Sequence, residues 1–349
     1  MNASVLKAAT SITMLGGLLV KFFIGRGIGL LIVIVCVIGI TAGCGASAAT
    51  DGVKHDEGDR KAGSAEAADR VESIDITDFA GRSVFFDKTP ERIVALGSGE
   101  VDIVYALGGE VVGRPDTEDP LLNEKAGSAA KVGSTHTVDL EKIAVLKPDV
   151  LLGNDPLNLK DVPLLESIGA KVVLTHANSV EDILDQIGLI GRLLGKEERA
   201  AELMGDIENG LAKRAKKQAG KTRVLLVYGA PGTYLAALPN SLSGDILTKA
   251  GGLNVAGEFQ AMQNFPQYAQ LNTERVVQSN PDVILIMTHG SSEEVEKGFV
   301  REMEGSPAWS ALNAVREGRI HVLPADLFGT NPGTRVLEAI VLLQELLEP

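Results

Sequence analysis

The sequence predicts an α/β protein of two lobes joined by a single long α-helix. Strand-like apolar runs alternate with helical segments, which is typical of a sheet covered by helices. Residues 139–152 (DLEKIAVLKPDVLL) recur 133 positions later, at 272–285, as NTERVVQSNPDVIL. Each copy is interpreted as an N-cap (Asp139 or Asn272), a helix, a proline stop and a buried strand. Between the copies, aliphatic residues recur at steps of three or four over residues 179–217, which predicts one amphipathic helix.

The composition excludes several classes of protein. The chain has 349 residues, enough for about two domains, and a formal net charge of −13. The first 43 residues contain no acid, so the rest holds 30 basic and 46 acidic residues. This excess of acidic residues would repel the phosphate backbone of a nucleic acid, which argues against nucleic-acid binding. The two cysteines, Cys36 and Cys44, precede the folded part, which therefore has no disulfide and no thiolate site.

The first 44 residues are predicted to be a signal peptide. Lys21 and Arg26 precede an apolar run at 27–40. As a helix this run is about 21 Å long, short of the ~30 Å core of a bilayer. Small residues before Cys44 resemble the lipobox of bacterial lipoproteins, in which that cysteine is lipidated, although Thr41 stands where an aliphatic residue is usual. An uncleaved signal anchor is the alternative, and either places the body outside the cytoplasm at a membrane surface.

The remaining boundaries follow from composition and pattern. Residues 45–71 are Gly, Ala, Ser and charged residues without apolar period, which predicts a flexible tether. The first lobe is expected at 72–178, the connecting helix at 179–218 and the second lobe at 219–349. Each glycine within the helix weakens it by about 1 kcal/mol relative to alanine, so a local bend is compatible with the pattern. These glycines are Gly188, Gly191, Gly195 and Gly205.

Several motifs carry a resemblance to a known family. They are ERIVALGSGEVDIVYALG (91–108), VDLEKIAVLKPDVLLG (138–153), LNTERVVQSNPDVILI (271–286) and GRIHVLPADLFGTNPG (318–333). With them, residues 72–349 resemble the substrate-binding lipoproteins of ABC importers for iron chelates, haem and cobalamin. The resemblance implies a ligand cleft between the lobes, a permease and its ATPase as partners, and a place at the outer face of the cytoplasmic membrane, anchored through Cys44.

Glu141 and Glu274 occupy the same position in the two repeats, in the first turn of each helix. In the family, such a pair of carboxylates docks onto arginines of the permease, and an exposed carboxylate forms a charge-assisted contact with a guanidinium. The alternative is that each acid only complements its helix dipole. A dipole does not require the same position twice, so docking is the preferred interpretation.

His136 and His289 are the predicted ligands of a haem iron. His289 follows the strand ILIMT (284–288), at the edge where open α/β sheets bind ligands, and His136 lies in the loop before the first repeated helix. Two imidazoles facing a cleft could supply both axial ligands of haem. The chain is similar to haem-binding lipoproteins of Gram-positive uptake systems, whose ligands fall in comparable places. A lone histidine is more often structural, and His176 and His321 are interpreted as core or strand-end residues.

A haem pocket also needs apolar walls and a cation for the propionates. Arg114 and Arg335 are the candidate cations. The candidate wall residues are Met262, Phe265, Tyr268 and Phe328. Methionine and aromatic side chains in loops often serve only packing.

Other functions fit the sequence less well. The stretch AGKT (219–222) imitates a P-loop, but Ala215 stands at its first glycine; GSGEVD has Asp102 at the third glycine of a dinucleotide motif. With no GxSxG or HExxH motif either, we expect no enzymatic activity. A zinc or manganese carrier would need clustered histidines, and the five present are scattered. An iron-siderophore or cobalamin carrier of the same family remains the alternative, since neither ligand requires His136 or His289.

Overall fold

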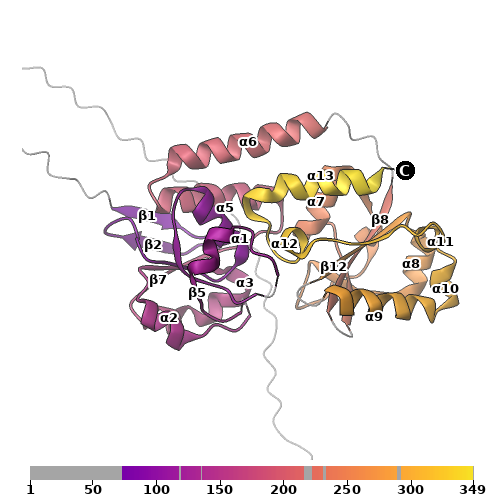
Figure 1. Cartoon of the computed structure of the whole chain (residues 1–349), viewed down its shortest axis with the longest axis horizontal. Helices are drawn as coiled ribbons and strands as arrows, with labels where there is room; N and C mark the ends of the chain where they lie inside the picture. The colour runs from indigo at the N-terminus through magenta and orange to yellow at the C-terminus, as the bar shows by residue number, and fades with distance from the viewer. Residues whose placement is uncertain are drawn as a thin grey trace, which may run out of the picture. The chain divides into compact units, whose positions relative to one another are not determined.

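A computed structural model describes residues 73–117, 119–134, 136–215, 222–230, 233–288 and 292–348 (Figure 1). These residues form two α/β lobes, each built around its own sheet, as the sequence predicts. The signal peptide and tether predicted for residues 1–71 lie outside the described residues. Of the helices described, none is both long and apolar enough to cross a bilayer.

The first lobe is built on a parallel sheet. Its strands, in the order β5-β4-β3-β6-β7, are β3 (Ile93–Ala95), β4 (Val111–Arg114), β5 (Ala130–Lys131), β6 (Val150–Asn154) and β7 (Lys171–Thr175). β3 and the first four residues of β6 are fully buried and apolar or glycine, as expected for strands covered on both faces. An antiparallel hairpin of β1 (Ile74–Thr77) and β2 (Ser83–Phe86) lies beside β7.

Short helices connect these strands. They are α1 (Ser98–Ala106), η1 (Glu124–Ser128), α2 (Leu140–Leu146), α3 (Asp155–Asn158), η2 (Leu159–Asp161) and α4 (Val162–Glu166). Because β3, β4 and β5 are parallel, the segments that follow them all leave the same edge of the sheet.

The second lobe has a mixed sheet in the order β11-β9-β8-β12-β13, with β10 also paired to β8. Its strands are β8 (Arg223–Ala230), β9 (Thr233–Ala237), β10 (Leu253–Asn254), β11 (Tyr268–Gln270), β12 (Val283–Thr288) and β13 (Ile320–Val322). Its helices are α7 (Leu242–Ala250), η3 (Val255–Glu258), α8 (Thr273–Ser279), α9 (Ser292–Glu304), α10 (Pro307–Ser310), α11 (Asn313–Arg316), α12 (Ala325–Phe328), η4 (Gly333–Arg335) and α13 (Val336–Leu347).

The repeat found in the sequence is also a repeat in structure. The Asp139 carboxylate accepts a hydrogen bond from the backbone N–H of Lys142 (3.1 Å), and the Asn272 amide oxygen accepts one from that of Arg275 (3.0 Å). These caps start α2 and α8, and each helix is followed by a buried strand, β6 or β12. The predicted order of N-cap, helix, stop and strand is therefore confirmed in both copies.

One long helix joins the lobes, as predicted, but it does not cover the predicted residues 179–218. The chain forms α5 (Val180–Leu193) and α6 (Glu197–Ala215), which pack against each other (Figure 1). Gly195 adopts a left-handed backbone (φ +60°) that reverses the chain between them. Gly191 lets the two helices approach, because a Cβ there would lie 2.5 Å from the Cβ of Ala200. The apolar spacing continues through the turn because both helices bury one face in the same core.

The two lobes share that core. It includes Ile103 of α1, Ile187 of α5, Leu247 of α7 and Ile340 of α13. The lobes are also joined through α1, which packs against η4, and the Asp102 carboxylate of α1 accepts hydrogen bonds from the backbone N–H and the hydroxyl of Thr334 (both 2.7 Å). The first lobe is therefore held directly against the second, and not only through α6.

Candidate functional site

The candidate site lies at the C-terminal edge of the sheet in the first lobe. The segments that leave this edge are the start of α1 at Ser98, the loop that follows Arg114 and the loop that follows Lys131. The backbone N–H of Asp116 donates to the carbonyl of Gly133 (2.7 Å), so the last two loops are tied together. Open α/β sheets bind ligands at this edge.

His136 lies on the surface of the loop after β5. The backbone N–H of Thr137 donates to the Ser134 carbonyl (3.1 Å). Gly133, at φ +97°, pairs with Val138. The side chain of His136 is exposed immediately before α2, in the loop where the sequence places it. An imidazole so placed is accessible to a large ligand.

His289 lies outside the described residues, so its position relative to His136 stays a prediction. The residue before it, Thr288, is the last residue of β12 and is fully buried. Within the described part of the chain, its hydroxyl oxygen has no hydrogen-bond partner. Those residues also hold no cluster of three or more His, Cys, Asp or Glu side chains suited to a metal ion.

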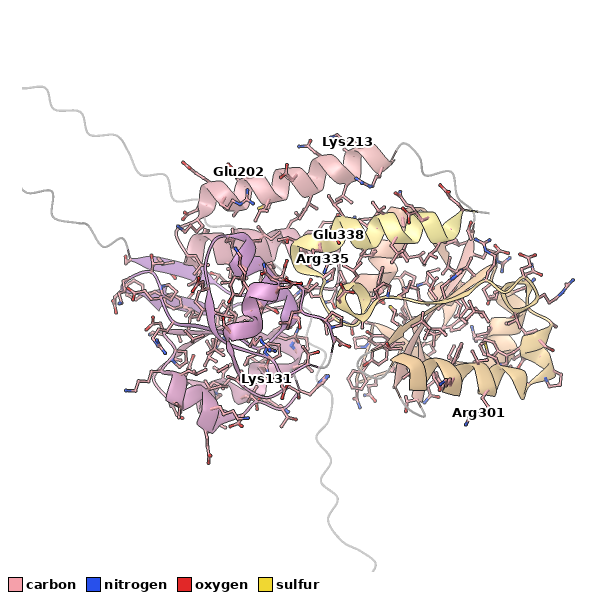
Figure 2. The ribbon with its side chains drawn as sticks, in the orientation of Figure 1. Lys131, Glu202, Lys213, Arg301, Arg335 and Glu338 are labelled. Carbon is pink, nitrogen blue, oxygen red and sulfur yellow. The ribbon has the colours of Figure 1, made fainter. Side chains whose placement is uncertain are left out.

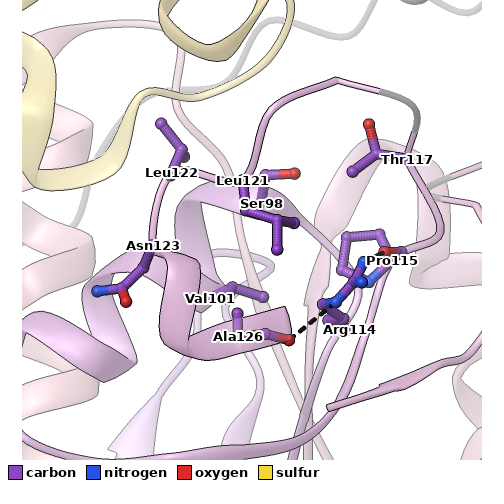
Figure 3. A pocket seen from close by; sticks show the side chains of 9 residues that line it. All are labelled: Ser98, Val101, Arg114, Pro115, Thr117, Leu121, Leu122, Asn123 and Ala126. Carbon is purple, nitrogen blue, oxygen red and sulfur yellow. Dashed lines mark hydrogen bonds between the residues drawn. The ribbon is translucent and has the colours of Figure 1, made fainter. Parts of the chain in front are cut away.

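A pocket of about 250 Å³, open mouth included, lies beside α1 (Figure 3). Polar side chains on its wall are Ser98, Arg114, Thr117 and Asn123. The remaining lining residues are Val101, Pro115, Leu121, Leu122 and Ala126. The pocket therefore opens between the start of α1 and the loop after β4, at the ligand edge of the sheet.

Arg114 is the charged residue of this pocket. Its side chain is buried, with 7% of the residue exposed. Nε donates to the carbonyl of Ala126 (2.9 Å) and Nη1 to that of Pro115 (3.0 Å). The carboxylate of Asp116 is instead paired with Lys131 (2.7 Å), whose hydrogen bond holds the pKa of Asp116 below its ordinary value. Among the described residues Arg114 forms no ion pair.

Met262, Phe265 and Tyr268 are brought together by one loop of the second lobe. The backbone N–H of Met262 donates to the Tyr268 carbonyl (2.8 Å), and that of Tyr268 to the Phe265 carbonyl (2.9 Å). Phe265 is 53% exposed. In the same loop, the amide of Gln267 donates to Asn178 of the first lobe (3.4 Å). Met262 and Phe265 therefore lie on a loop that reaches the other lobe, and Tyr268 lies where this loop enters β11.

Tyr268 is a neutral phenol in this setting. Its ring packs against Tyr228, with the centroids 5.5 Å apart. Burial raises the pKa of Tyr268 to about 12, and the neighbouring Tyr228 adds to the shift. A phenol with that pKa is a poor source of phenolate at neutral pH.

Arg335 and Phe328 are differently placed from the other candidates. Arg335 pairs with Asp326 (3.0 Å) and, at the start of α13, with Glu338 (2.8 Å), as Figure 2 shows for the second pair. The hydrogen bonds that Arg335 donates to the Glu338 carboxylate are the main reason that the pKa of Arg335 is raised. Phe328, expected on a pocket wall, is instead 5% exposed and packs in the shared core. The charge of Arg335 is thus already neutralised, and Phe328 serves packing.

Glu141 and Glu274 are both exposed, in the first turns of α2 and α8. Neither carboxylate forms an ion pair with any residue that the structure describes. Each is therefore open to a partner, as the docking hypothesis requires. His176, at the end of β7, lies with Nδ1 2.9 Å from Asp155, and His321 lies within β13. Both match their interpretation as strand or strand-end residues.

Sequence reasoning missed a buried polar chain beside the site. The Thr175 hydroxyl donates to Glu100 (2.9 Å) and accepts from the Gln186 amide (2.9 Å), and Asn331 of the second lobe donates to Gln186 (2.8 Å). Glu100 is 4% exposed, and burial raises the pKa of its carboxyl. In the sequence, Glu100 was noted only as part of GSGEVD, which does not match the dinucleotide-binding motif. A charged residue inside an apolar helix pattern was the available signal.

Comparison with known proteins points to one family. The profile of a family described as periplasmic binding protein matches residues 93–327. The high-affinity heme uptake system protein IsdE of Staphylococcus aureus (strain MRSA252) is 28% identical over 239 residues, covering 68% of this chain and 80% of IsdE.

Solved structures agree with this result. The crystal structure of S. aureus IsdE complexed with heme aligns with a TM-score of 0.66 at 26% identity, over 74% of this chain and 99% of that one. An ABC transporter substrate-binding protein from Listeria monocytogenes EGD-e aligns at 0.65 with 28% identity, over 74% and 98%. The vitamin B12 binding protein BtuF of Vibrio cholerae, at 20% identity and 0.60, over 74% and 97%, shares the fold.

Proposed function

The chain belongs to the periplasmic binding protein family, as a substrate-binding protein of an ABC transporter of the haem, iron-chelate and vitamin B12 class, and we propose that its substrate is haem. The observation that carries this proposal is the exposed imidazole of His136 at the ligand edge of the first sheet. The similarity to IsdE, whose crystal structure contains heme, supports it. Haem would be captured outside the cytoplasm and passed intact to a permease.

The iron would be bound by His136 and His289. Neutral imidazole is a common axial ligand of haem iron, and His289 directly follows β12, whose end corresponds to the ligand edge of the second sheet. Tyr268, whose ring packs against that of Tyr228, would form part of the wall of the site. Met262 and Phe265 would cover the macrocycle from the same loop.

The remaining roles concern delivery. Glu141 and Glu274 would present the loaded protein to arginines of the permease, one carboxylate from each lobe. A lipid on Cys44 would hold the protein at the outer face of the cytoplasmic membrane, with residues 45–71 as a tether. Because the lobes share a core, we expect them to move little when haem binds.

An absorption titration with haemin tests this proposal. The full-length chain, purified in detergent, should show a saturable, low-spin, six-coordinate spectrum that His136→Ala or His289→Ala degrades. His321→Ala, within β13, is the matched control and should leave the spectrum unchanged. A spectrum like that of free haemin would reject haem as the substrate, and iron siderophores and cobalamin would then be titrated. Binding that neither of the first two substitutions affects would reject the axial pair.

A further inference from the structure

Residues 329–334 (GTNPGT), which we call the strap, connect the second lobe to the first. The strap leaves α12, which packs against β12 of the second lobe, and enters η4, which packs against α1 of the first (Figure 1). The part of α1 that it meets belongs to GSGEVD (97–102). Two glycine-containing motifs of the sequence therefore come together where the lobes join.

The strap is bound along one face of α1. The Asp102 carboxylate, which is 4% exposed, accepts hydrogen bonds from the backbone N–H and the hydroxyl of Thr334 (both 2.7 Å). Three residues earlier, and so on the same face, Gly99 lets the strap approach, because a Cβ there would overlap the amide nitrogen of Asn331. The Asn331 side chain also accepts from the backbone N–H of Gly333 (2.9 Å). The strap is thus braced internally and held by α1 at two points.

At its other end the strap lies on the last residue of β12. A Cβ on Gly329 would be 2.8 Å from the backbone carbonyl oxygen of Thr288. Thr288 is fully buried at the end of β12, and His289 follows it in the sequence. If the strap lost its hold on Asp102, the backbone that leads to His289 would therefore lose a support from the first lobe.

We propose that Asp102 is a positioning residue for ligand binding, which fixes the end of β12 relative to the ligand edge of the first lobe through the strap. The inference rests on the proposed function and deepens it, because axial ligands from two lobes bind one iron only at a set separation. Residues that orient metal ligands strongly affect binding. Since α1 itself starts at that ligand edge, at Ser98, one helix carries the edge of the first lobe and holds the strap of the second.

The first test measures the iron coordination of the loaded protein. Asp102→Ala removes the acceptor of both Thr334 bonds, whereas Asp102→Asn keeps an oxygen acceptor in place. On the full-length chain, Asp102→Ala should bind haemin about 10-fold more weakly and give a five-coordinate, high-spin spectrum. Added imidazole should restore the six-coordinate spectrum, and Asp102→Asn should behave as the wild type. A wild-type spectrum in Asp102→Ala would overturn the inference, even if the free energy of unfolding falls.

Asp245→Ala is the matched control, because Asp245 makes a comparable contact elsewhere. Its carboxylate, on α7 of the second lobe, accepts from the backbone N–H of Val180 at the start of α5 (2.8 Å). This substitution should lower the free energy of unfolding and leave the haemin spectrum unchanged. The same spectral change in Asp245→Ala as in Asp102→Ala would reject a special role for the strap.

Gly329→Ala acts from the other end of the strap, in case Asp102→Ala does not fold. Its methyl group would press on the Thr288 carbonyl and should produce the same high-spin spectrum. Gly257→Ala is the control for this variant, because its Cβ would meet only Pro239, at an ordinary contact distance of 3.7 Å. A wild-type spectrum in Gly329→Ala would contradict the inference.

Hydrogen exchange separates a failure of this inference from a failure of the proposed function. In the haem-free, full-length chain, Asp102→Ala should speed exchange of the backbone N–H groups of residues 286–288 by about 10-fold relative to those of residues 150–153 in β6. If the wild type binds no haemin, the proposed function fails and this exchange decides the role of Asp102, with an unchanged ratio overturning it. If the wild type binds haemin but Asp102→Ala changes neither spectrum nor exchange, only the role of Asp102 is overturned.

Discussion

Lys147 and Asn280, 133 residues apart, both adopt a left-handed backbone at the residue that ends a helix. Lys147 follows α2 with φ +46°, and Asn280 follows α8 with φ +39°. Among the described residues they are the non-glycine positions with positive φ. In each copy the residue two positions on is an aspartate, Asp149 or Asp282, which accepts a backbone N–H at the start of the neighbouring strand. The repeat therefore preserves a strained turn as well as a pattern of apolar residues.

Replacing Lys147 by glycine should stabilise the protein. A left-handed conformation costs a residue with a Cβ about 1–2 kcal/mol, and glycine gives back part of this through its unfolded-state entropy. We expect Lys147→Gly to raise the free energy of unfolding by about 0.5–1 kcal/mol in urea titrations. Asn280→Gly should gain nothing, since asparagine tolerates this conformation and its side chain accepts from the backbone N–H of Asn313 (3.0 Å). Lys213→Gly is the control: it places glycine within α6, where it should lower the free energy of unfolding.

Two glycines of the helical pair test the chain reversal between α5 and α6. In a single straight helix Gly191 and Ala200 would be about 13 Å apart along the axis, so alanine at 191 would be harmless or favourable. In the hairpin its Cβ would meet that of Ala200. Gly191→Ala should therefore lower the melting temperature, whereas Gly205→Ala, which faces open space, should stabilise by about 1 kcal/mol. Stabilisation by both substitutions would support the single helix.

The contrast between these two regions shows what the sequence could predict. The repeat was visible because Asp139, Asn272 and the Pro-Asp pairs are local signals for caps and stops. The reversal at Gly195 was not, because apolar spacing reports which residues are buried and not whether a chain turns between them. The pairing of Gln186 with Asn331 was equally hidden, since it joins residues 145 positions apart. Arg114 could be identified as a candidate from its place at a strand end, but the sequence did not indicate that its side chain is buried without a carboxylate partner.

Asn331 should stabilise the junction between the lobes. Its amide donates to Gln186, which is fully buried, so Asn331→Ala leaves a buried carbonyl oxygen without its donor. Such a loss costs about 1–3 kcal/mol. In a double-mutant cycle, the same substitution in a Gln186→Leu background should cost less, with a coupling energy of about 0.5–3 kcal/mol in urea titrations. Strictly additive effects would show that this contact does not hold the lobes together.

Glu100 should make stability depend on pH. Burial raises the pKa of its carboxyl above the ordinary value of 4.5, against smaller opposing effects of its own backbone N–H and of Thr175. A carboxyl raised in the folded state favours folding below the unfolded pKa, and this contribution is lost as pH rises through the folded pKa. Relative to the wild type, Glu100→Gln should therefore gain stability as pH rises above about 4.5. Urea titrations from pH 4 to 8 measure this difference in the free energy of unfolding. Glu110→Gln, at an exposed position, is the control and should show the pH dependence of the wild type. If Glu100→Gln showed the same pH dependence as the wild type, the pKa of Glu100 would not be raised.

The two explanations for Glu141 and Glu274 predict opposite pairs of results. If each acid only complements a helix dipole, Glu141→Gln and Glu274→Gln should each cost about 0.3–1 kcal/mol of stability and leave transport unchanged. If they dock onto the permease, stability changes little, while each substitution weakens binding to the permease complex by about 10- to 100-fold. Binding of labelled protein to permease in nanodiscs, with unfolding measured alongside, separates the two. Glu208→Gln, exposed in the interior of α6, should alter neither. The double substitution should abolish uptake while haemin affinity stays at the wild-type value, because neither glutamate is among the residues proposed to contact haem.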